Sequence, residues 1–142
     1  EVTSSSCIGS SSFNQKNVFL FNDDRLFFNS KNLNNSWFCY HFKDRKIKIS
    51  DYSIRSSSYG GKGSCHLLNW VIEGSKDQKN WSVLDVRNDE KSLDNCSAEN
   101  SFRVCSQEND YFEYIRIRQT GPNSYGDNQL TFSVIEFFGS IK

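Results

Sequence analysis

The fold of this chain is decided by residues 70–81, which read Trp-Val-Ile-Glu-Gly-Ser-Lys-Asp-Gln-Lys-Asn-Trp. The first half favours a β-strand, the Ser-x-Asp segment favours a turn, and Trp81 opens another strand. Residues 114–121 read Tyr-Ile-Arg-Ile-Arg-Gln-Thr-Gly and alternate apolar with basic side chains up to a glycine. Neither stretch holds a nucleophile with a base, a set of metal ligands or a phosphate loop. Both stretches therefore indicate architecture.

Short apolar runs of the same kind recur along the chain, separated by loops rich in Ser and Asn. Strands are predicted over residues 18–21, 37–42, 47–55, 67–73, 81–85, 101–105, 111–119 and 130–138. About eight short strands without a convincing helix indicate an all-β jelly-roll sandwich of antiparallel strands. We find no linker and no internal repeat, so residues 1–142 are expected to form a single domain.

Composition narrows the classes of function. The 17 basic and 17 acidic residues balance, which argues against binding to nucleic acid or to an anionic membrane. No apolar run is long enough to cross a bilayer. The five cysteines have irregular spacing, which favours free thiols in a reducing compartment. A secreted domain with one or two disulfides is the rival interpretation.

Several motifs in a fixed order resemble the F5/8 type C (discoidin-like) domains, which have galactose-binding-like jelly rolls. The motifs are Thr3–Ser6, Leu20–Asp23, Trp37, Ser75–Asp77 with Asn80–Trp81, Tyr114–Ile117 and Ile135–Gly139. The amino-acid sequences of these motifs are most similar to those of an intracellular branch of the family, found beside BTB domains in protists. The chain departs from the family at Gln78, where glycine is usual, and at His41, where an acidic residue is usual. It also lacks the cysteine after Gly139 that secreted members pair with an N-terminal cysteine.

The resemblance implies a non-catalytic binding module with its ligand loops at one end of the sandwich. Candidate ligand-binding residues on these loops are Phe27, Phe28, Tyr59, Lys62, His66, Asn123 and Tyr125. Exposed Phe27 and Phe28 would favour a membrane or a protein, although both also fit a core role. A cleft between Tyr59 and Tyr125 with polar donors would favour a sugar.

Three functions follow from this resemblance. The first is protein–protein interaction within a larger intracellular protein or assembly, cytoplasmic or cytoskeletal, such as a ciliary complex. The alternative is a lectin-like module that binds glycans at the loop end. A further alternative is lipid binding through the loop tips, for which the loops hold few basic residues.

A structural calcium ion is the one cofactor that the resemblance suggests. Asn22, Asp23 and Asp24 cluster on one predicted bend, and Glu136 lies on the last strand, where related jelly rolls place a ligand. An Asx turn with solvated carboxylates is the alternative.

The stretches at residues 70–81 and 114–121 also predict where some of their side chains lie. Trp81 and Tyr114 are expected to pack between the sheets. Arg116 and Arg118 are expected to pair with acidic neighbours such as Glu113 or Glu136 at the sheet surface.

Overall fold

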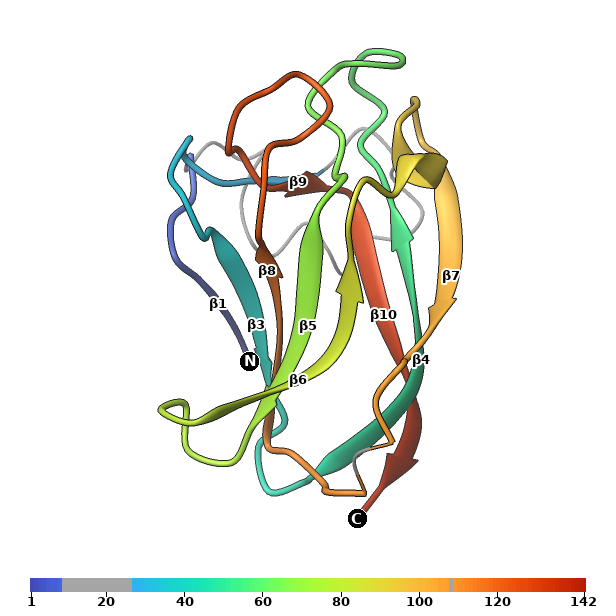
Figure 1. Cartoon of the computed structure of the whole chain (residues 1–142). Helices are drawn as coiled ribbons and strands as arrows, with labels where there is room; N and C mark the ends of the chain where they lie inside the picture. The colour runs from blue at the N-terminus through green and yellow to red at the C-terminus, as the bar shows by residue number, and fades with distance from the viewer. Residues whose placement is uncertain (9–26, 108) are drawn as a thin grey trace.

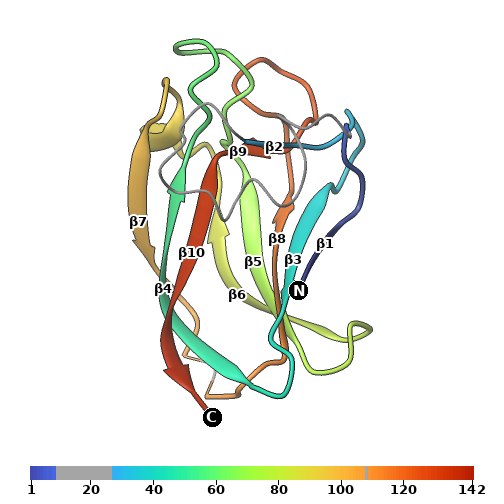
Figure 2. The ribbon, with the colours of Figure 1, turned by 180° about the vertical axis from the view of Figure 1, so that it is seen from behind.

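Two antiparallel sheets face each other across an apolar core in the computed structural model of this protein, which describes residues 1–8, 27–107 and 109–142 (Figure 1). One sheet has the strand order β1 (Val2–Ser4), β3 (Trp37–His41), β8 (Tyr114–Gln119), β5 (Trp70–Ser75) and β6 (Trp81–Arg87). The other, seen best from behind, has the order β10 (Val134–Ile141), β4 (Ile47–Arg55) and β7 (Glu99–Arg103) (Figure 2). A short pair, β2 (Phe28–Asn29) with β9 (Thr131–Phe132), lies at one end. This arrangement confirms the predicted all-β jelly roll.

The predicted strands differ from the observed ones mainly at their ends. The last predicted strand is divided at Ser133 into β9 and β10, and β10 continues past Gly139 to Ile141. The strand expected over residues 18–21 lies outside the described residues. The described helical structure is η2 (Lys91–Leu93), a single 3₁₀ turn. None of the helical segments in the described ranges has the length and apolar character needed to span a bilayer.

The core is built by the inward faces of the strands. In β8, Ile115 and Ile117 are buried, and Ile117 lies opposite Ile72 of β5 and Phe38 of β3. Alternation with a period of two residues directs Tyr114, Arg116 and Arg118 to the outer face. Side chains of both sheets join one buried cluster, which holds the sheets together by apolar burial.

The glycine of the opening motif allows two elements to approach closely. A Cβ atom added to Gly74 would lie 2.6 Å from the Phe112 ring. Phe112 is buried and bridges to Ile47 at the start of β4. Glycine is therefore required at this position because the ring occupies the space of a side chain.

The structure corrects the expected placement of two aromatic residues. The core tryptophan is Trp70, which is fully buried, whereas Trp81 is half-buried. Trp81 lies opposite Ser75, which is on the outer face because Trp70 and Ile72 face the core. Tyr114 also lies on the outer face, where its ring stacks on His41 with 4.5 Å between the centroids. Strand parity decides the face, and the sequence motif alone does not show it.

The arginines of β8 are paired, but not with the expected partners. The Glu73 carboxylate accepts a hydrogen bond from Arg116 Nε at 2.6 Å and another from Arg118 Nη2 at 2.9 Å. Burial opposes ionisation of Glu73, but the two guanidinium groups outweigh it and lower the pKa of the carboxyl. The expected partners are placed elsewhere, since Glu113 accepts from His41 Nε2 at 2.9 Å and Glu136 lies in the other sheet.

The predicted turn after β5 is stabilised by its own side chains. The Ser75 hydroxyl accepts hydrogen bonds from the backbone N–H groups of Asp77 and Gln78. Asp77 Oδ1 accepts from the N–H groups of Lys79 and Asn80, each at 2.8 Å. The bonds from Asn80 and Lys79 lower the pKa of Asp77 far below its usual range. The Ser-x-Asp sequence is thus a turn that leads the chain from β5 into β6.

Candidate functional site

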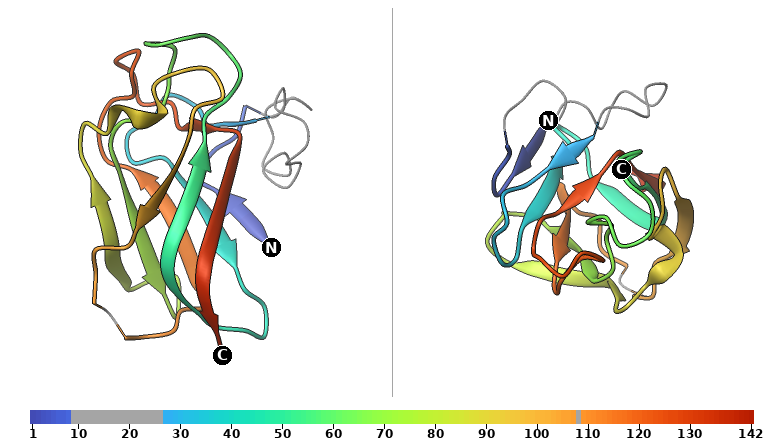
Figure 3. Two further views of the ribbon diagram at one scale, coloured as in Figure 1. Left: turned by 90° about the vertical axis from the view of Figure 1, so that its right-hand side faces the viewer. Right: turned by 90° about the horizontal axis from the view of Figure 1, so that it is seen from above.

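Four loops meet at one end of the sandwich, where β4, β6 and β8 end and β3, β5 and β7 begin. They are residues 30–36, 56–69, 88–98 and 120–130. Figure 1 shows them at the top, and Figure 3 shows this end from above. The C-terminal residue lies at the opposite end (Figure 1). The loops that carry Tyr59, His66, Asn123 and Tyr125 therefore gather at one end of the sandwich.

Hydrogen bonds tie these loops to one another. His66 N donates to Ser124 Oγ at 2.8 Å, and Ser124 N donates back to His66 O at 2.9 Å. Gly63 N donates to Asp94 Oδ1 at 2.8 Å, and Asn128 N donates to Asn32 Oδ1 at 2.7 Å. Loops fixed in this way need little further ordering when a ligand binds, which favours affinity.

The buried pair His66 and Asp94 is central to this network. His66 Nδ1 lies 3.2 Å from Asp94 Oδ1, and the His66 side chain is only 1% exposed. Burial opposes ionisation of Asp94, but hydrogen bonds from Gly63 N, the Ser124 hydroxyl and His66 outweigh it and lower the pKa of the carboxyl. His66 Nε2 is buried without a hydrogen-bond partner among the described residues. His66 thus supports the loops from below and is not a surface donor.

Asn123 also has a structural role, in the loop that carries Tyr125. Its Oδ1 accepts hydrogen bonds from the backbone N–H groups of Tyr125, Gly126 and Asp127. Its Nδ2 donates to Asp127 Oδ1 at 2.7 Å and to Gln129 O at 2.9 Å. Since the side chain is buried and its polar atoms are engaged, Asn123 shapes the loop and does not contact a ligand directly.

Phe27 and Phe28 do not form exposed loop tips. Phe28 lies in β2 and is fully buried, with its ring centroid 5.0 Å from Phe38 and 5.5 Å from Phe132. Phe27 is 8% exposed. Pairing of β2 with β9 directs Phe28 into the core, whereas Phe27 precedes β2 and is buried beside a cavity.

A cavity of about 250 Å³ lies beside the long loop 56–69. It is lined by Phe27, Asn29, Ser57, Tyr59, Ser64, Cys65, Gln129 and Thr131. Tyr59 is 72% exposed, so its ring is free to contact a ligand. Tyr125 is similarly exposed at 71% but is not part of this lining. The expected cleft between Tyr59 and Tyr125 is therefore replaced by a cavity between Tyr59 and the β2–β9 pair.

The side chains that line this cavity determine which ligands it suits. None of the described side chains that line it is a lysine, arginine, aspartate or glutamate. Lys62 is exposed on the same loop but does not belong to the lining. Burial raises the pKa of the Cys65 thiol, and the nearby Asp127 raises it further, so this cysteine stays protonated at neutral pH. The cavity thus has no charged side chain and a mainly apolar lining, to which Asn29, Gln129 and Thr131 add neutral polar groups.

Sequence reasoning missed Asn29, Gln129 and Thr131. Asn29 and Thr131 lie opposite each other in β2 and β9, and Thr131 Oγ1 donates to Asn29 Oδ1 at 2.9 Å. Thr131 falls inside the strand predicted over residues 130–138, but the two-residue strand β2 carries too little alternation to be detected in a sequence, so its pairing with β9 was not foreseen. No local signal therefore places these residues at the site.

The structure leaves the calcium expectation open. Asn22, Asp23 and Asp24 lie outside the described residues. Glu136 is half-buried in β10, opposite Ser53 of β4. Within the described part of the chain, no group of three or more His, Cys, Asp or Glu side chains is arranged to hold a metal ion.

Comparison with known sequences places this chain beside small parts of very long proteins. It is 34% identical over 93 residues to the E3 ubiquitin-protein ligase hecd-1 of Caenorhabditis elegans, an alignment that covers 65% of this chain. It is 31% identical over 93 residues to the E3 ubiquitin-protein ligase Ufd4 of Drosophila melanogaster, covering 63% of this chain. The chain spans only 3% of the length of these relatives. No family model matches the sequence.

Comparison with solved structures identifies the fold. The domain CpGH89CBM32-5 of Clostridium perfringens, solved in complex with GalNAc-beta-1,3-galactose, superposes with a TM-score of 0.73 at 11% identity, covering 98% of this chain and 94% of that one. A fucose binding module of Streptococcus pneumoniae gives a TM-score of 0.70 at 12% identity, covering 99% and 91%. The chain thus has the galactose-binding-like jelly-roll fold of discoidin-like domains.

Proposed function

We propose that this chain is a non-catalytic recognition module that binds carbohydrate at its loop end. The observation that carries the proposal is the cavity of about 250 Å³ with the exposed ring of Tyr59 at its side. A tyrosine ring stacks on the apolar face of a sugar, while neutral polar groups bond to its hydroxyls. Asn29, Gln129 and Thr131 supply such groups on the opposite side.

The rigidity of the loops supports this proposal. Asp94 and Asn123 hold the loop backbones through bonds made by their side chains, so the cavity wall is formed before a ligand arrives. A preformed site loses less conformational entropy on binding. The fold supports it as well, since the two structural neighbours described above are a carbohydrate-binding domain and a fucose binding module by name.

A second candidate is recognition of a protein within a larger polypeptide. It is favoured by the alignment with about 3% of the length of two ubiquitin-protein ligases, which is the pattern of one module in a long chain. We further propose that the parent protein is intracellular, because Cys39, Cys65, Cys96 and Cys105 form no disulfide. In this case the loop end, or another face of the sandwich, binds a partner protein and so links that partner to the larger polypeptide.

The carbohydrate proposal is tested by titrating the chain with galactose, N-acetylgalactosamine and fucose while recording amide shifts by NMR. We expect shifts that map to residues 57–65 and 129–131, and we expect Tyr59→Ala to abolish them. Tyr125→Ala is the matched control, because it removes an equally exposed tyrosine from outside the cavity. Absence of shifts with all sugars and with a glycan array would overturn the carbohydrate function. Capture of a specific protein by the full-length parent, lost with Tyr59→Ala, would then favour the second candidate.

A further inference from the structure

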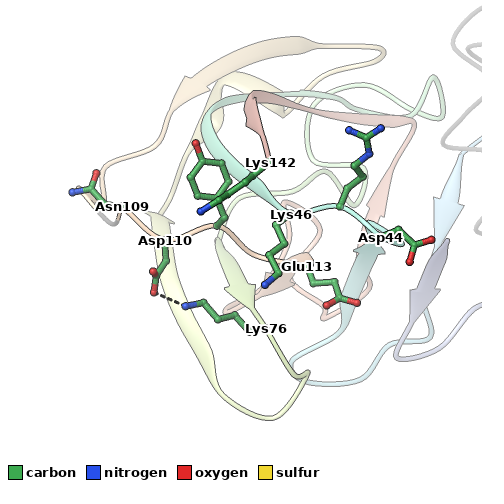
Figure 4. A pocket seen from close by; sticks show the side chains of 9 residues that line it. Asp44, Lys46, Lys76, Asn109, Asp110, Glu113 and Lys142 are labelled. Carbon is green, nitrogen blue, oxygen red and sulfur yellow. Dashed lines mark ion pairs between the residues drawn. The ribbon is translucent and has the colours of Figure 1, made fainter.

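Cavities at the two ends of the sandwich differ in their charge. A cavity of about 730 Å³ lies at the end opposite the loops and is lined by charged side chains of both signs (Figure 4). Lys76 Nζ lies 3.0 Å from Asp110 Oδ2, as the dashed line shows. Lys142 Nζ lies over the Tyr111 ring, 5.4 Å from its centroid. Because opposite charges lie together there, this cavity favours neither sign of charge in a ligand. In the loop-end cavity, by contrast, none of the described lining residues carries a charge.

The described lining of the loop-end cavity has no cation to pair with an acidic sugar. Lys62, on the same loop as Tyr59, is exposed and does not belong to this lining. Burial, and then the carboxylate of Asp127, raises the pKa of the Cys65 thiol, so a negative charge lies close to the cavity. An acidic sugar bound here would lose the hydration of its carboxylate without a cationic partner, and Asp127 would repel it. The cavity therefore favours an uncharged sugar.

Neutral hydrogen-bonding groups line this cavity from β2, β9 and the loop before β9. Thr131 Oγ1 donates to Asn29 Oδ1 at 2.9 Å, which orients the Asn29 amide and leaves its Nδ2 group as the donor. The backbone of Gln129 is fixed, because its N–H donates to Asp127 Oδ1 at 3.1 Å and its carbonyl accepts from Asn123 Nδ2 at 2.9 Å. The Gln129 side-chain amide adds an acceptor and further donors. These amides suit the hydroxyl or amide groups of a neutral sugar.

Most of the cavity wall is apolar. Phe27 is 8% exposed and directly precedes Phe28, which packs in the core. A hydroxyl group placed against such a wall loses bonds to water that the wall does not replace, whereas a methyl group gains from burial. The volume of about 250 Å³ is below the roughly 300–1,000 Å³ of pockets for drug-sized ligands, so the cavity suits one sugar unit.

We propose that the loop-end cavity selects a single uncharged sugar unit that carries a methyl group, as 6-deoxy sugars and acetamido sugars do. This inference rests on the carbohydrate function proposed above and narrows it. The Tyr59 ring stacks on the sugar, and the amides of Asn29 and Gln129 bond to its polar groups. The methyl group lies against the Phe27 ring, which makes Phe27 a specificity-determining residue, whereas Tyr59 contributes to the binding of every sugar.

The inference is tested by NMR titration of the 142-residue chain with galactose, 6-deoxygalactose, N-acetylgalactosamine and galacturonic acid, and with the corresponding four sugars of the gluco configuration. We expect at least one methyl-bearing sugar to bind about tenfold more tightly than its parent sugar. The uronic acids are expected to cause no shifts in residues 57–65 and 129–131. Comparison of the 6-deoxy with the acetamido sugars shows which substituent supplies the methyl group.

Substitution of Phe27 tests its role in this selectivity. Phe27→Ala is expected to reduce the tenfold preference to about twofold, and the milder Phe27→Leu to about threefold. Phe138→Ala is the matched control, because it removes an exposed phenylalanine of β10 from outside the lining, and it should keep the full preference. Urea denaturation checks that each variant folds, and the comparison of sugars on the wild type needs no variant.

The outcomes separate this inference from the carbohydrate function itself. If a parent sugar or a uronic acid binds as tightly as the methyl-bearing sugars, and Tyr59→Ala still abolishes binding, the selectivity is overturned and the carbohydrate function stands. A preference that persists in both Phe27 variants overturns the role of Phe27. If none of the sugars binds, the carbohydrate function and this inference fail together.

Discussion

The indole Nε1 of Trp70 donates a hydrogen bond of 2.9 Å to the hydroxyl of Tyr52 across the core. Trp70 belongs to the five-stranded sheet and Tyr52 to the three-stranded sheet, so this bond joins the two layers. The same hydroxyl donates to Asp85 Oδ2 at 2.5 Å, and Arg87 Nε donates to that carboxylate at 2.9 Å. Burial, and then the bond to Asp85, raises the pKa of Tyr52 far above its usual range.

Removal of the hydroxyl at position 52 is expected to destabilise the sandwich. Tyr52→Phe leaves the buried groups of Trp70 and Asp85 without a shared partner, which costs about 1–3 kcal/mol of unfolding free energy. Urea denaturation followed by tryptophan fluorescence measures the loss. Tyr125→Phe, which changes an exposed hydroxyl, is the control and should be neutral. A Tyr52→Phe variant as stable as the wild type would show that the network does not stabilise the fold.

Neutralising Glu73 is expected to lower the free energy of unfolding, because two guanidinium groups donate hydrogen bonds to its carboxylate. Glu73→Gln should destabilise the protein by about 2–3 kcal/mol, somewhat less than for a fully buried pair, since both arginines are partly exposed. Glu113→Gln serves as the control, because its carboxylate has no arginine partner among the described contacts. Equal losses in the two variants would contradict a special role for Glu73.

Stability is expected to fall on acidification. The pKa values of Glu73, Asp85 and Asp94 are all lowered in the folded protein, so their contribution is complete above their ordinary values of 4.5, 3.8 and 3.8. It is lost as pH falls through the lower folded values, because the unfolded chain takes up protons first. Thermal midpoints recorded from pH 7 to pH 3 should decline mainly below pH 4.5, the ordinary value for Glu73. Glu73→Gln should show a shallower decline, and an unchanged profile in that variant would exclude Glu73 as a contributor.

Replacement of Gln78 by glycine is expected to stabilise the turn after β5. Gln78 has a φ of 63°, a left-handed conformation in which a side chain is strained. Gln78→Gly should add up to about 1 kcal/mol of stability, after the entropy that glycine gains in the unfolded chain is subtracted. Lys79→Gly is the matched control at a neighbouring position without positive φ and should lower stability. A loss of stability with Gln78→Gly would mean that the turn tolerates its glutamine without strain.

The loop end is expected to loosen when Asp94 is removed. Asp94→Ala deletes the acceptor for Gly63 N and for His66 Nδ1, so amide hydrogen exchange in residues 57–66 should accelerate. Exchange in β8 and β10 should stay slow, since the Asp94 side chain bonds to the loop residues Gly63 and His66. Weaker sugar binding in Asp94→Ala with Tyr59 still in place would link loop order to ligand affinity. Unchanged exchange would show that the other loop contacts suffice.

Local patterns predicted most of the framework correctly. The strand–turn–strand unit at residues 70–81 and the alternation of Ile115 with Ile117 are visible in the sequence and are present in the structure. Both follow from interactions between residues that are near in the chain, namely turn hydrogen bonds and a period of two. The order of motifs also identified the fold, which structural neighbours confirm at a TM-score of 0.73.

The candidate site was predicted less well, because its residues are set by contacts between distant segments. Tyr59 was placed correctly on an exposed loop, but His66 and Asn123 proved to be buried supports. Residues such as His, Asn and Ser serve equally as ligand contacts and as loop braces, and composition does not distinguish these roles. The partners Asp94 and Ser124 decide the role of His66, and both are far from it in the sequence.

The sequence by itself determined the all-β class, most of the strands and the Ser-x-Asp turn, since these depend on local propensity and side-chain periodicity. The gathering of the loops at one end was implied by the resemblance to discoidin-like domains. Only the tertiary structure decided which tryptophan enters the core, because Trp70 and Trp81 differ in strand parity and not in chemistry. It also decided that Glu73 holds both Arg116 and Arg118, through the pairing of β5 with β8. The pairing of β10 with β4 likewise places Lys142 opposite Lys46, so that residues far apart in the sequence line one cavity.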